Sequence, residues 1–241
     1  MRSVPEIYLG PRTVFFLYTW HMNSKEGLNY MNQVLSQPQF RGVSHRIMFF
    51  ISIAASIPLI VKSTNQIELV ATIIYSFGLL SMFGFSALYH RKNLTIRKKK
   101  LLRKFDHSGI FLMIAGTFTP ICLLVLPKES GLELLTAVWL ASVIGILVFV
   151  FSENVPRLIR AFIFLLVGYF IFPFMPAVIL ALNVQEIFLL LSGGIVYSLG
   201  AVAYGIRFPV LSPEVFGFHE FFHALVVVAA TLHFFLIFGL T

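Results

Sequence analysis

The segment FGFHEFFHALVVVAATLHFF, residues 216–235, decides the fold class, because it is almost wholly apolar over the length that a helix needs to cross a bilayer. Its first half nevertheless holds His219 and His223, and a spacing of four residues places both side chains on one helical face. Such a pair is typical of metal ligands. The segment therefore raises the question of which other polar residues reach the same depth of the same membrane.

The apolar character extends along most of the 241 residues, of which 58% are hydrophobic and only 12% are charged. Soluble domains carry about 25% charged residues, so the composition predicts a multi-pass integral membrane protein. Cys122 is the only cysteine, which excludes an intrachain disulfide and any CxxC motif. We expect no cleaved signal peptide, because the early VFFLYTW stretch is short and no small-residue cleavage site follows it.

Hydropathy predicts an all-α fold, a seven-transmembrane helix bundle. The expected spans cover residues 45–62, 67–90, 105–126, 132–151, 159–181, 186–205 and 218–239. Residues 41–241 then form one seven-helix membrane domain, and the more polar residues 1–40 form an N-terminal cytoplasmic extension. Pro120, Pro173 and Pro176 fall inside expected spans, where a bundle tolerates kinks because neighbouring helices satisfy the freed backbone groups.

The basic residues predict the orientation. Of the eighteen Lys and Arg residues, all but Lys62 and Lys128 fall on one side of the predicted membrane. The positive-inside rule makes that side cytoplasmic, with the N-terminus inside and Thr241 outside, in the plasma (bacterial inner) membrane. The basic stretch RKNLTIRKKKLLRK, residues 91–104, is expected to contact anionic lipid headgroups. A basic patch alone is weak support for nucleic-acid binding, which we do not expect.

Three segments that are distant in sequence bring polar residues to the cytoplasmic side. His90 ends the second span, and Ser86 lies one helical turn deeper on the same face. Asp106, the only aspartate, enters at the start of the third span, and the histidine pair of residues 219 and 223 occupies the first turns of the seventh. The topology therefore predicts that these five residues meet in one layer.

Neutral imidazoles suit Zn²⁺, and three of them leave a fourth position open for water. Zinc lowers the pKa of a bound water toward about 7 and polarises a carbonyl, as hydrolysis of an amide or ester requires. The candidate metal ligands are His90, His219 and His223, and the candidate catalytic residues are Asp106 and Ser86. Taken singly, His90 also suits an interfacial residue that faces headgroups, and Asp106 suits a helix cap.

The other histidines fit this set less well. His107 points about 100° away from Asp106, and His233 lies roughly 15 Å beyond the histidine pair of the seventh span. His45, in RGVSH, reads as a structural residue near the inner boundary. HEFFH satisfies the HExxH pattern with Glu220 as the general base. An intramembrane protease would need a further ligand, and this chain has no aspartate after residue 106.

Several motifs together resemble the hemolysin III family, within the progestin and adipoQ receptor family of seven-span membrane proteins. They are RGVSH, SALYH (86–90), FDHSGIF (105–111), AGTFTP (115–120), GGIVYSLG (193–200), HEFFHALV and LHF, and they extend over about residues 40–240. The resemblance implies that the family's SxxxH motif falls on Ser86 and His90, its aspartate on Asp106, and its HxxxH pair on His219 and His223. It also implies a zinc ion held by the three histidines and a relation to alkaline ceramidases, which cleave a lipid amide.

The leading expectation is therefore a zinc-dependent hydrolase that acts on the amide or ester of a membrane lipid. The alternative is a non-enzymatic protein, receptor-like, membrane-remodelling or cytolytic, in which a structural zinc braces the second, third and seventh spans. A conducting channel is not indicated, because no run of charges lines a span. The sequence leaves open the substrate, the oligomeric state and a metal other than zinc.

Overall fold

The computed structural model describes residues 38–241 apart from residues 93, 153, 154 and 213. The described residues form helices and one isolated bridge between Ser212 and Phe216, and they contain no sheet. The all-α prediction is therefore confirmed. The extension predicted for residues 1–40 falls almost entirely outside the described residues and stays a prediction.

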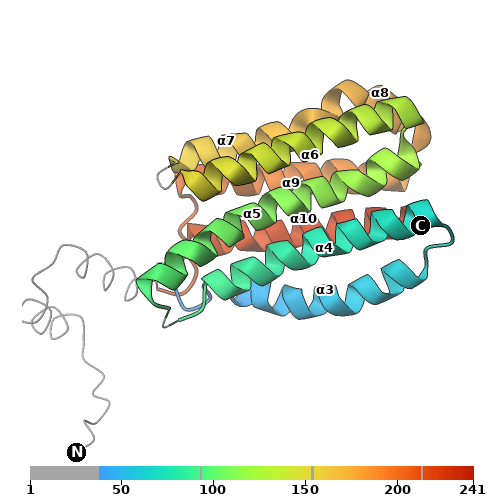
Figure 1. Cartoon of the computed structure of the whole chain (residues 1–241). Coiled ribbons are helices and arrows are strands. Elements are labelled where there is room, and N and C mark those ends of the chain that lie inside the picture. The colour runs from blue at the N-terminus through green and yellow to red at the C-terminus, as the bar shows by residue number, and fades with distance from the viewer. Residues whose placement is uncertain (1–37, 93, 153–154, 213) are drawn as a thin grey trace, which may run out of the picture. The chain divides into compact units, whose positions relative to one another are not determined.

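Seven helical spans within the described residues are long and apolar enough to cross a membrane, as predicted (Figure 1). They are α3 (Val43–Val61), α4 (Gln66–Tyr89), α5 (Ile96–Pro120) continued by the π-helix η1 (Ile121–Val125), α6 (Lys128–Phe151), the fifth span made of α7 (Arg157–Gly168), the 3₁₀ helix η2 (Tyr169–Phe174) and α8 (Met175–Ala181), then α9 (Val184–Ile206) and α10 (Phe218–Leu240). The chain is thus an integral multi-pass membrane protein.

Side-chain caps begin three of these helices. The side chain of Asn65 accepts hydrogen bonds from two backbone N–H groups of α4, and Asn183 forms a capping box with Glu186 at the start of α9. Thr95 accepts a bond from the backbone N–H of Lys98 and so begins α5. Each cap satisfies donors that the first turn of a helix leaves unpaired.

The third span begins nine residues before the expected position, at Ile96 instead of 105. Lys, Arg and Leu are good helix formers, so the basic stretch continues the helix beyond its apolar part. Asp106 consequently lies well inside α5, and Thr95 provides the cap. The simpler interpretation of Asp106 as a helix cap is therefore wrong.

The prolines alter the helices as expected. Pro120 is the last residue of α5, and the chain continues as a π-helix. In the fifth span the α-helix ends at Gly168, Pro173 lies in the 3₁₀ turn, and Pro176 lies in the first turn of α8. Proline has no backbone N–H to donate to the preceding helical turn. A π or 3₁₀ turn changes the backbone hydrogen-bond pattern beside it and so accommodates the missing bond.

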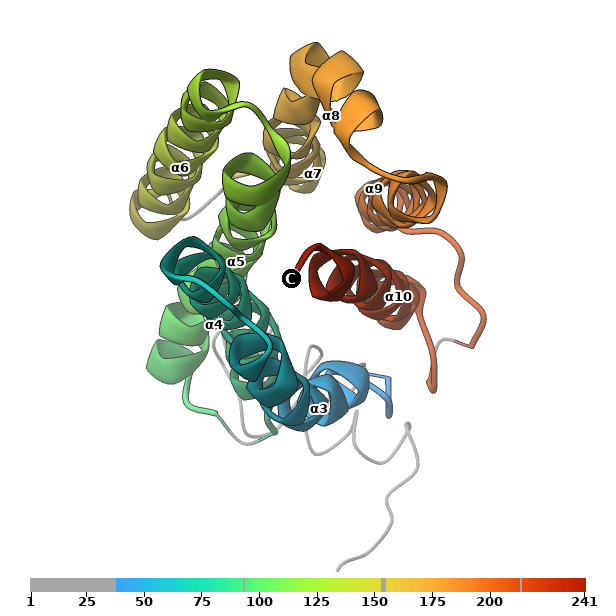
Figure 2. The same ribbon diagram turned by 90° about the vertical axis from the view of Figure 1, so that its right-hand side faces the viewer.

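Viewed end on, α5 occupies the interior, with α4, α6, α7 and α10 around it (Figure 2). The most apolar window of α5 is 67% buried, whereas that of the fifth span is 11% buried and faces outward. Close helix contact depends on glycine: a Cβ on Gly78 of α4 would lie 2.6 Å from the carbonyl oxygen of Leu112 in α5. Small residues of this kind let membrane helices approach closely.

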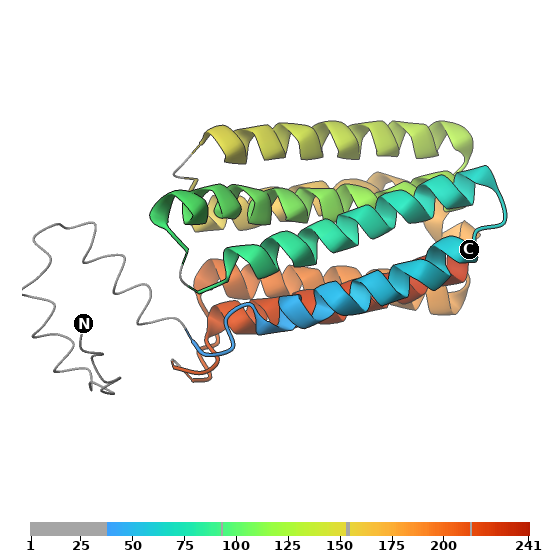
Figure 3. The same cartoon turned by 60° about the horizontal axis from the view of Figure 1, so that its bottom comes forward.

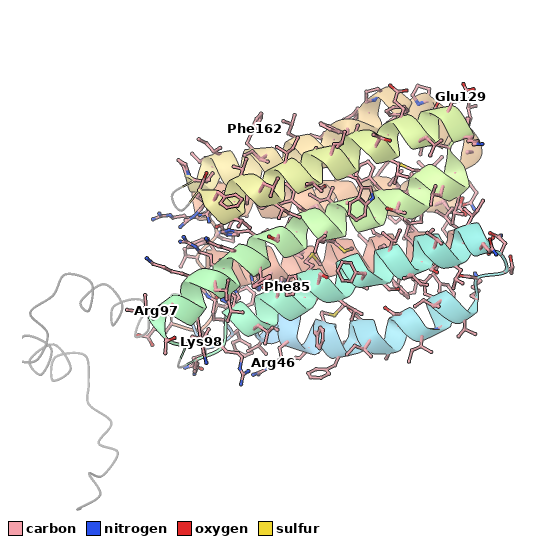
Figure 4. The ribbon with its side chains drawn as sticks, in the orientation of Figure 1. Arg46, Phe85, Arg97, Lys98, Glu129 and Phe162 are labelled. Carbon is pink, nitrogen blue, oxygen red and sulfur yellow. The ribbon has the colours of Figure 1, made fainter. Side chains whose placement is uncertain are left out.

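The helices alternate in direction, so the starts of α3, α5, α7 and α10 and the ends of α4, α6 and α9 lie at one end of the bundle (Figures 1 and 3). All described basic residues except Lys62 and Lys128 belong to this end, where the nitrogen atoms of Arg46, Arg97 and Lys98 gather (Figure 4). This one-sided distribution is the pattern that the positive-inside rule interprets as cytoplasmic. We call it the basic end.

Candidate metal centre

Three histidines from α10 and the end of α4 meet at the basic end. One ring nitrogen from each of His90, His219 and His223 lies within 4.8 Å of the other two. The Nε2 atoms of His90 and His219 are 3.2 Å apart, although 129 positions separate these residues in the chain. The predicted convergence of the three histidines is therefore present in the structure.

The start of α10 is fixed by a buried carboxylate. Glu220 is 3% exposed, accepts a hydrogen bond from the backbone N–H of Gly217 at 2.8 Å, and forms an ion pair with the guanidinium of Arg41. Removing Arg41 would leave this buried carboxylate without its charged partner, which is unfavourable. Glu220 thus holds the first turn of α10, which carries two of the histidines, and its carboxylate is already occupied by structural partners.

The segment that leads into α3 contacts the histidine cluster directly, a contact that the sequence reading did not predict. Gly42 adopts φ +72°, and a Cβ added to it would lie 2.4 Å from Cβ of His90. The ring of His45 is buried and stacks on His223 with ring centroids 3.8 Å apart and an interplanar angle of 9°. Both ring positions are therefore restrained from the α3 side, and the only signal for this in the sequence is the motif RGVSH.

Backbone hydrogen bonds join the same segment to the chain before α10. The N–H of Gln39 donates to the carbonyl of Glu214 at 3.0 Å, and the N–H of Phe40 donates to the carbonyl of Val215 at 3.3 Å. Together with the Arg41 ion pair, these bonds hold residues 38–45, which we call the clasp, against the start of α10 and the cluster. His45 thus lies against the cluster itself, a position that the sequence did not predict.

Ser86 and Asp106 lie beside each other at the α4–α5 contact. The Ser86 hydroxyl is buried, and it is close enough to the half-buried carboxylate of Asp106 to interact with it. Ser86 precedes His90 by one turn of α4, which places this pair roughly 6 Å along the helix from the cluster. Among the described residues Asp106 does not join the group of potential ligands.

The other histidines have separate partners. Nε2 of His107 lies 3.0 Å from a terminal guanidinium nitrogen of Arg160, on the α7 side of α5. Nε2 of His233 lies 3.1 Å from the carbonyl oxygen of Leu190 in α9. Neither belongs to the cluster, in agreement with the sequence-based expectation.

The cluster fits a tetrahedral metal ion by its chemistry and its spacing. Zn–N distances of about 2.0–2.1 Å imply ligand nitrogens roughly 3.4 Å apart. The 3.2 Å between the Nε2 atoms of His90 and His219 agrees with this value. All three ligand nitrogens lie within 4.8 Å of one another, so a small rotation of a ring would bring the remaining distances to the same value. Three buried or half-buried imidazoles can therefore hold a metal ion here, with a coordination position left over.

Fold and site together define a seven-span membrane protein with a three-histidine cluster at its basic end. The model of the family described as Haemolysin-III related matches residues 33–234, and the chain belongs to this family. The residues that suggested this resemblance include all three members of the cluster.

Curated relatives agree with this assignment. The chain is 31% identical to Hemolysin-3 of Bacillus cereus over 182 residues, which are 73% of this chain and 82% of that protein. It is 31% identical to the Hemolysin-3 homolog of Bacillus subtilis (strain 168) over 166 residues, 67% and 77% of the two chains. Progestin and adipoQ receptor-like protein 1 of Caenorhabditis elegans is 28% identical over 196 residues, 72% of this chain but 45% of that longer protein.

Proposed function

We propose that this protein is a zinc-dependent hydrolase that cleaves the amide or ester bond of a membrane lipid. The observation that carries the proposal is the set of three imidazole nitrogens within 4.8 Å of one another, with a serine–aspartate pair one helical turn away. Three neutral nitrogen ligands with an open fourth position are typical of catalytic zinc, whereas structural zinc sites usually have four protein ligands. His90, His219 and His223 are the proposed ligands.

When bound, zinc would supply an activated water and polarise the scissile carbonyl. In the proposed reaction Asp106 accepts the proton of the attacking water and passes it to the departing amine or alcohol. Ser86 holds the Asp106 carboxylate in place, or donates a hydrogen bond to the oxygen that becomes negative. Stacking of His45 on His223 fixes the plane of one ligand ring, so the ligand set needs little rearrangement.

A lipid substrate suits the surface of the bundle. Large apolar side chains are exposed along the spans other than the third, whose apolar part is mostly buried, as expected for helices that face acyl chains. A substrate dissolved in the bilayer would therefore meet a surface of the same character as its acyl chains. The five residues that resemble the alkaline ceramidase set favour a lipid amide over other carbonyl compounds.

A structural role for the metal is the second candidate. The candidate ligands come from α4 and α10, so a metal ion here would brace the ends of these two helices, and the clasp joins α3 to them without the metal. A receptor-like or cytolytic protein would need only this bracing. The two candidates differ at Asp106, which matters for hydrolysis and not for holding the metal.

The test measures metal content and lipid hydrolysis on the same purified chains. Mass spectrometry of the full-length protein in detergent should give about one zinc per chain in wild type and in Asp106→Asn, and none in His219→Ala. His233→Gln is the matched control, because it removes a histidine of the same helix that lies outside the cluster and should keep the zinc.

Release of fatty acid from a fluorescent ceramide should require the wild-type aspartate. Wild-type protein without metal would overturn the metal centre. Metal retention with equal lipid turnover in Asp106→Asn would remove Asp106 from the mechanism, and full metal retention without turnover of any lipid amide or ester would favour the structural role.

A further inference from the structure

We propose that Tyr75 of α4, Tyr197 of α9 and His233 of α10 form a polar site in the interior of the membrane that binds a water molecule and so links the three helices. The site is distinct from the histidine cluster. Along α4, Tyr75 lies 15 positions before His90, and along α10, His233 lies 14 positions after His219. Both therefore lie roughly 21–22 Å from the level of the cluster. Water binding here does not depend on the proposed hydrolysis.

The three side chains meet at this depth. The rings of Tyr197 and His233 are in contact, with their centroids 5.5 Å apart. Tyr75 lies close enough to Tyr197 for the two phenol groups to interact electrostatically. The arrangement of the helices allows this meeting, because α10 lies beside α9 and has α4 and α5 on another side (Figure 2). The site therefore joins three segments that are distant in the sequence.

Each of these side chains has a buried polar atom that makes no hydrogen bond with the described residues. These atoms are the two phenol hydroxyls and Nδ1 of His233. Tyr75 is completely buried and His233 is only 7% exposed. A serine hydroxyl can turn to a carbonyl of its own helix, but a phenol hydroxyl stands too far from its own backbone to do so. Buried polar groups are nearly always hydrogen-bonded, and an exception is commonly explained by an ordered water.

The hydrogen-bonding capacity of the site matches one water molecule. Nε2 of His233 lies 3.1 Å from the carbonyl oxygen of Leu190 and donates its proton there. A neutral imidazole carries only one N–H group, so Nδ1 accepts a hydrogen bond. Each phenol hydroxyl can donate or accept. A water that donates to Nδ1 and bonds to both phenol oxygens has three partners, the number typical of buried water.

The surroundings favour the smallest neutral ligand. The ring of His233 packs so closely on α9 that a Cβ added to Gly193 would lie 2.3 Å from it. The ring of Tyr75 belongs to the buried apolar core. An ion at this depth would need charged partners, whereas three neutral groups satisfy a neutral molecule. Polar bridges between helices contribute to the packing of a membrane bundle, and this water would supply one.

A crystal structure of the full chain, grown in a lipidic mesophase, tests the proposal. One rounded solvent peak should lie within about 3.2 Å of both phenol oxygens and of Nδ1 of His233. The double variant Tyr75→Phe with Tyr197→Phe keeps both rings but leaves the water one partner, so the peak should be lost. Tyr169→Phe is the matched control and should keep the peak, because the Tyr169 hydroxyl has its own partner, Oγ of Ser198, at 2.8 Å.

Hydrogen bonds formed directly among the three groups, with no peak between them, would overturn the site. Density that continues from the peak into an acyl chain would overturn water as the ligand and assign the groups to a lipid hydroxyl. A peak that persists at full height in the double variant would overturn the role of the phenols.

Solid-state NMR of the full chain in lipid bilayers is a second measurement. The ring of His233 should receive magnetisation from water, whereas the fully buried ring of Phe111 should not. Equal transfer to the two rings, or none to either, would contradict the site. A melting curve identifies misfolded variants, and the single variant Tyr197→Phe, with a weakened peak, replaces the double variant if that chain fails to assemble.

Discussion

Replacing Gly42 with alanine should damage the histidine cluster from outside it. The backbone of Gly42 has φ +72°, and this left-handed conformation costs a residue with a Cβ about 1–2 kcal/mol. The new Cβ would also lie 2.4 Å from Cβ of His90, which is too close for any two side-chain carbons. Overpacking of a filled site costs about 1–3 kcal/mol. We therefore expect Gly42→Ala to lower the free energy of unfolding by about 2–5 kcal/mol.

The same substitution should weaken metal binding, because Cβ of His90 is attached directly to the ligand ring and must move with it. Changes to residues that orient metal ligands typically cost about 10–100-fold in affinity. Thermal unfolding in detergent and zinc titration with a competing chelator measure the two effects. Gly194→Ala is the control, because nothing lies within 4 Å of its added Cβ in α9. Wild-type stability together with wild-type zinc affinity in Gly42→Ala would refute the contact between Gly42 and His90.

Three further predictions concern the same end of the bundle and its neighbours. His45→Phe should keep the zinc affinity within about threefold of wild type, whereas His45→Ala should lose about tenfold, because only phenylalanine preserves the stack on His223. Equal losses of affinity in the two variants would instead give the imidazole nitrogens of His45 a role. Gly193→Ala should lower the melting temperature, since its Cβ would lie 2.3 Å from the ring of His233. Gly194→Ala, one position along, should leave the melting temperature unchanged or raise it, because nothing lies within 4 Å of its Cβ. Similar melting temperatures for the two variants would contradict the packing of Gly193 on His233. Removing zinc with a chelator should lower the free energy of unfolding by about 2.7 kcal/mol, relative to protein held at a free zinc concentration one hundred times the dissociation constant. His219→Ala should abolish this difference. A wild-type melting curve that the chelator leaves unchanged would disprove it.

The spans and the meeting of the three histidines could be predicted from the sequence because both follow from one-dimensional information. Apolar length fixes the number of crossings, and the direction of each crossing then determines which residues share a layer. This was sufficient to bring His90 to the start of α10. The same reasoning misplaced the start of α5, because a helix can continue into water when its residues favour helical structure, and hydropathy registers only its apolar part.

The clasp could not be predicted in this way. Stacking of His45 on His223 depends on how α3 and α10 are rotated about their own axes. In a membrane helix that is apolar on all sides, hydrophobic periodicity carries little information about rotation. The ion pair between Arg41 and Glu220 also joins residues 179 positions apart, and an HExxH pattern suggests a catalytic role for this glutamate that its cap and its arginine partner do not support.

The separation of the ligands along the chain has a consequence for biogenesis. His90 enters the bilayer with the second span, but its two partners arrive only with the seventh, 129 and 133 positions later. While the ribosome is still delivering the middle spans, an isolated imidazole cannot hold zinc at the strength of a three-ligand set. A metal ion held by all three histidines could therefore be acquired only after the last helix has been inserted, so that metal loading would mark the chains whose assembly is complete.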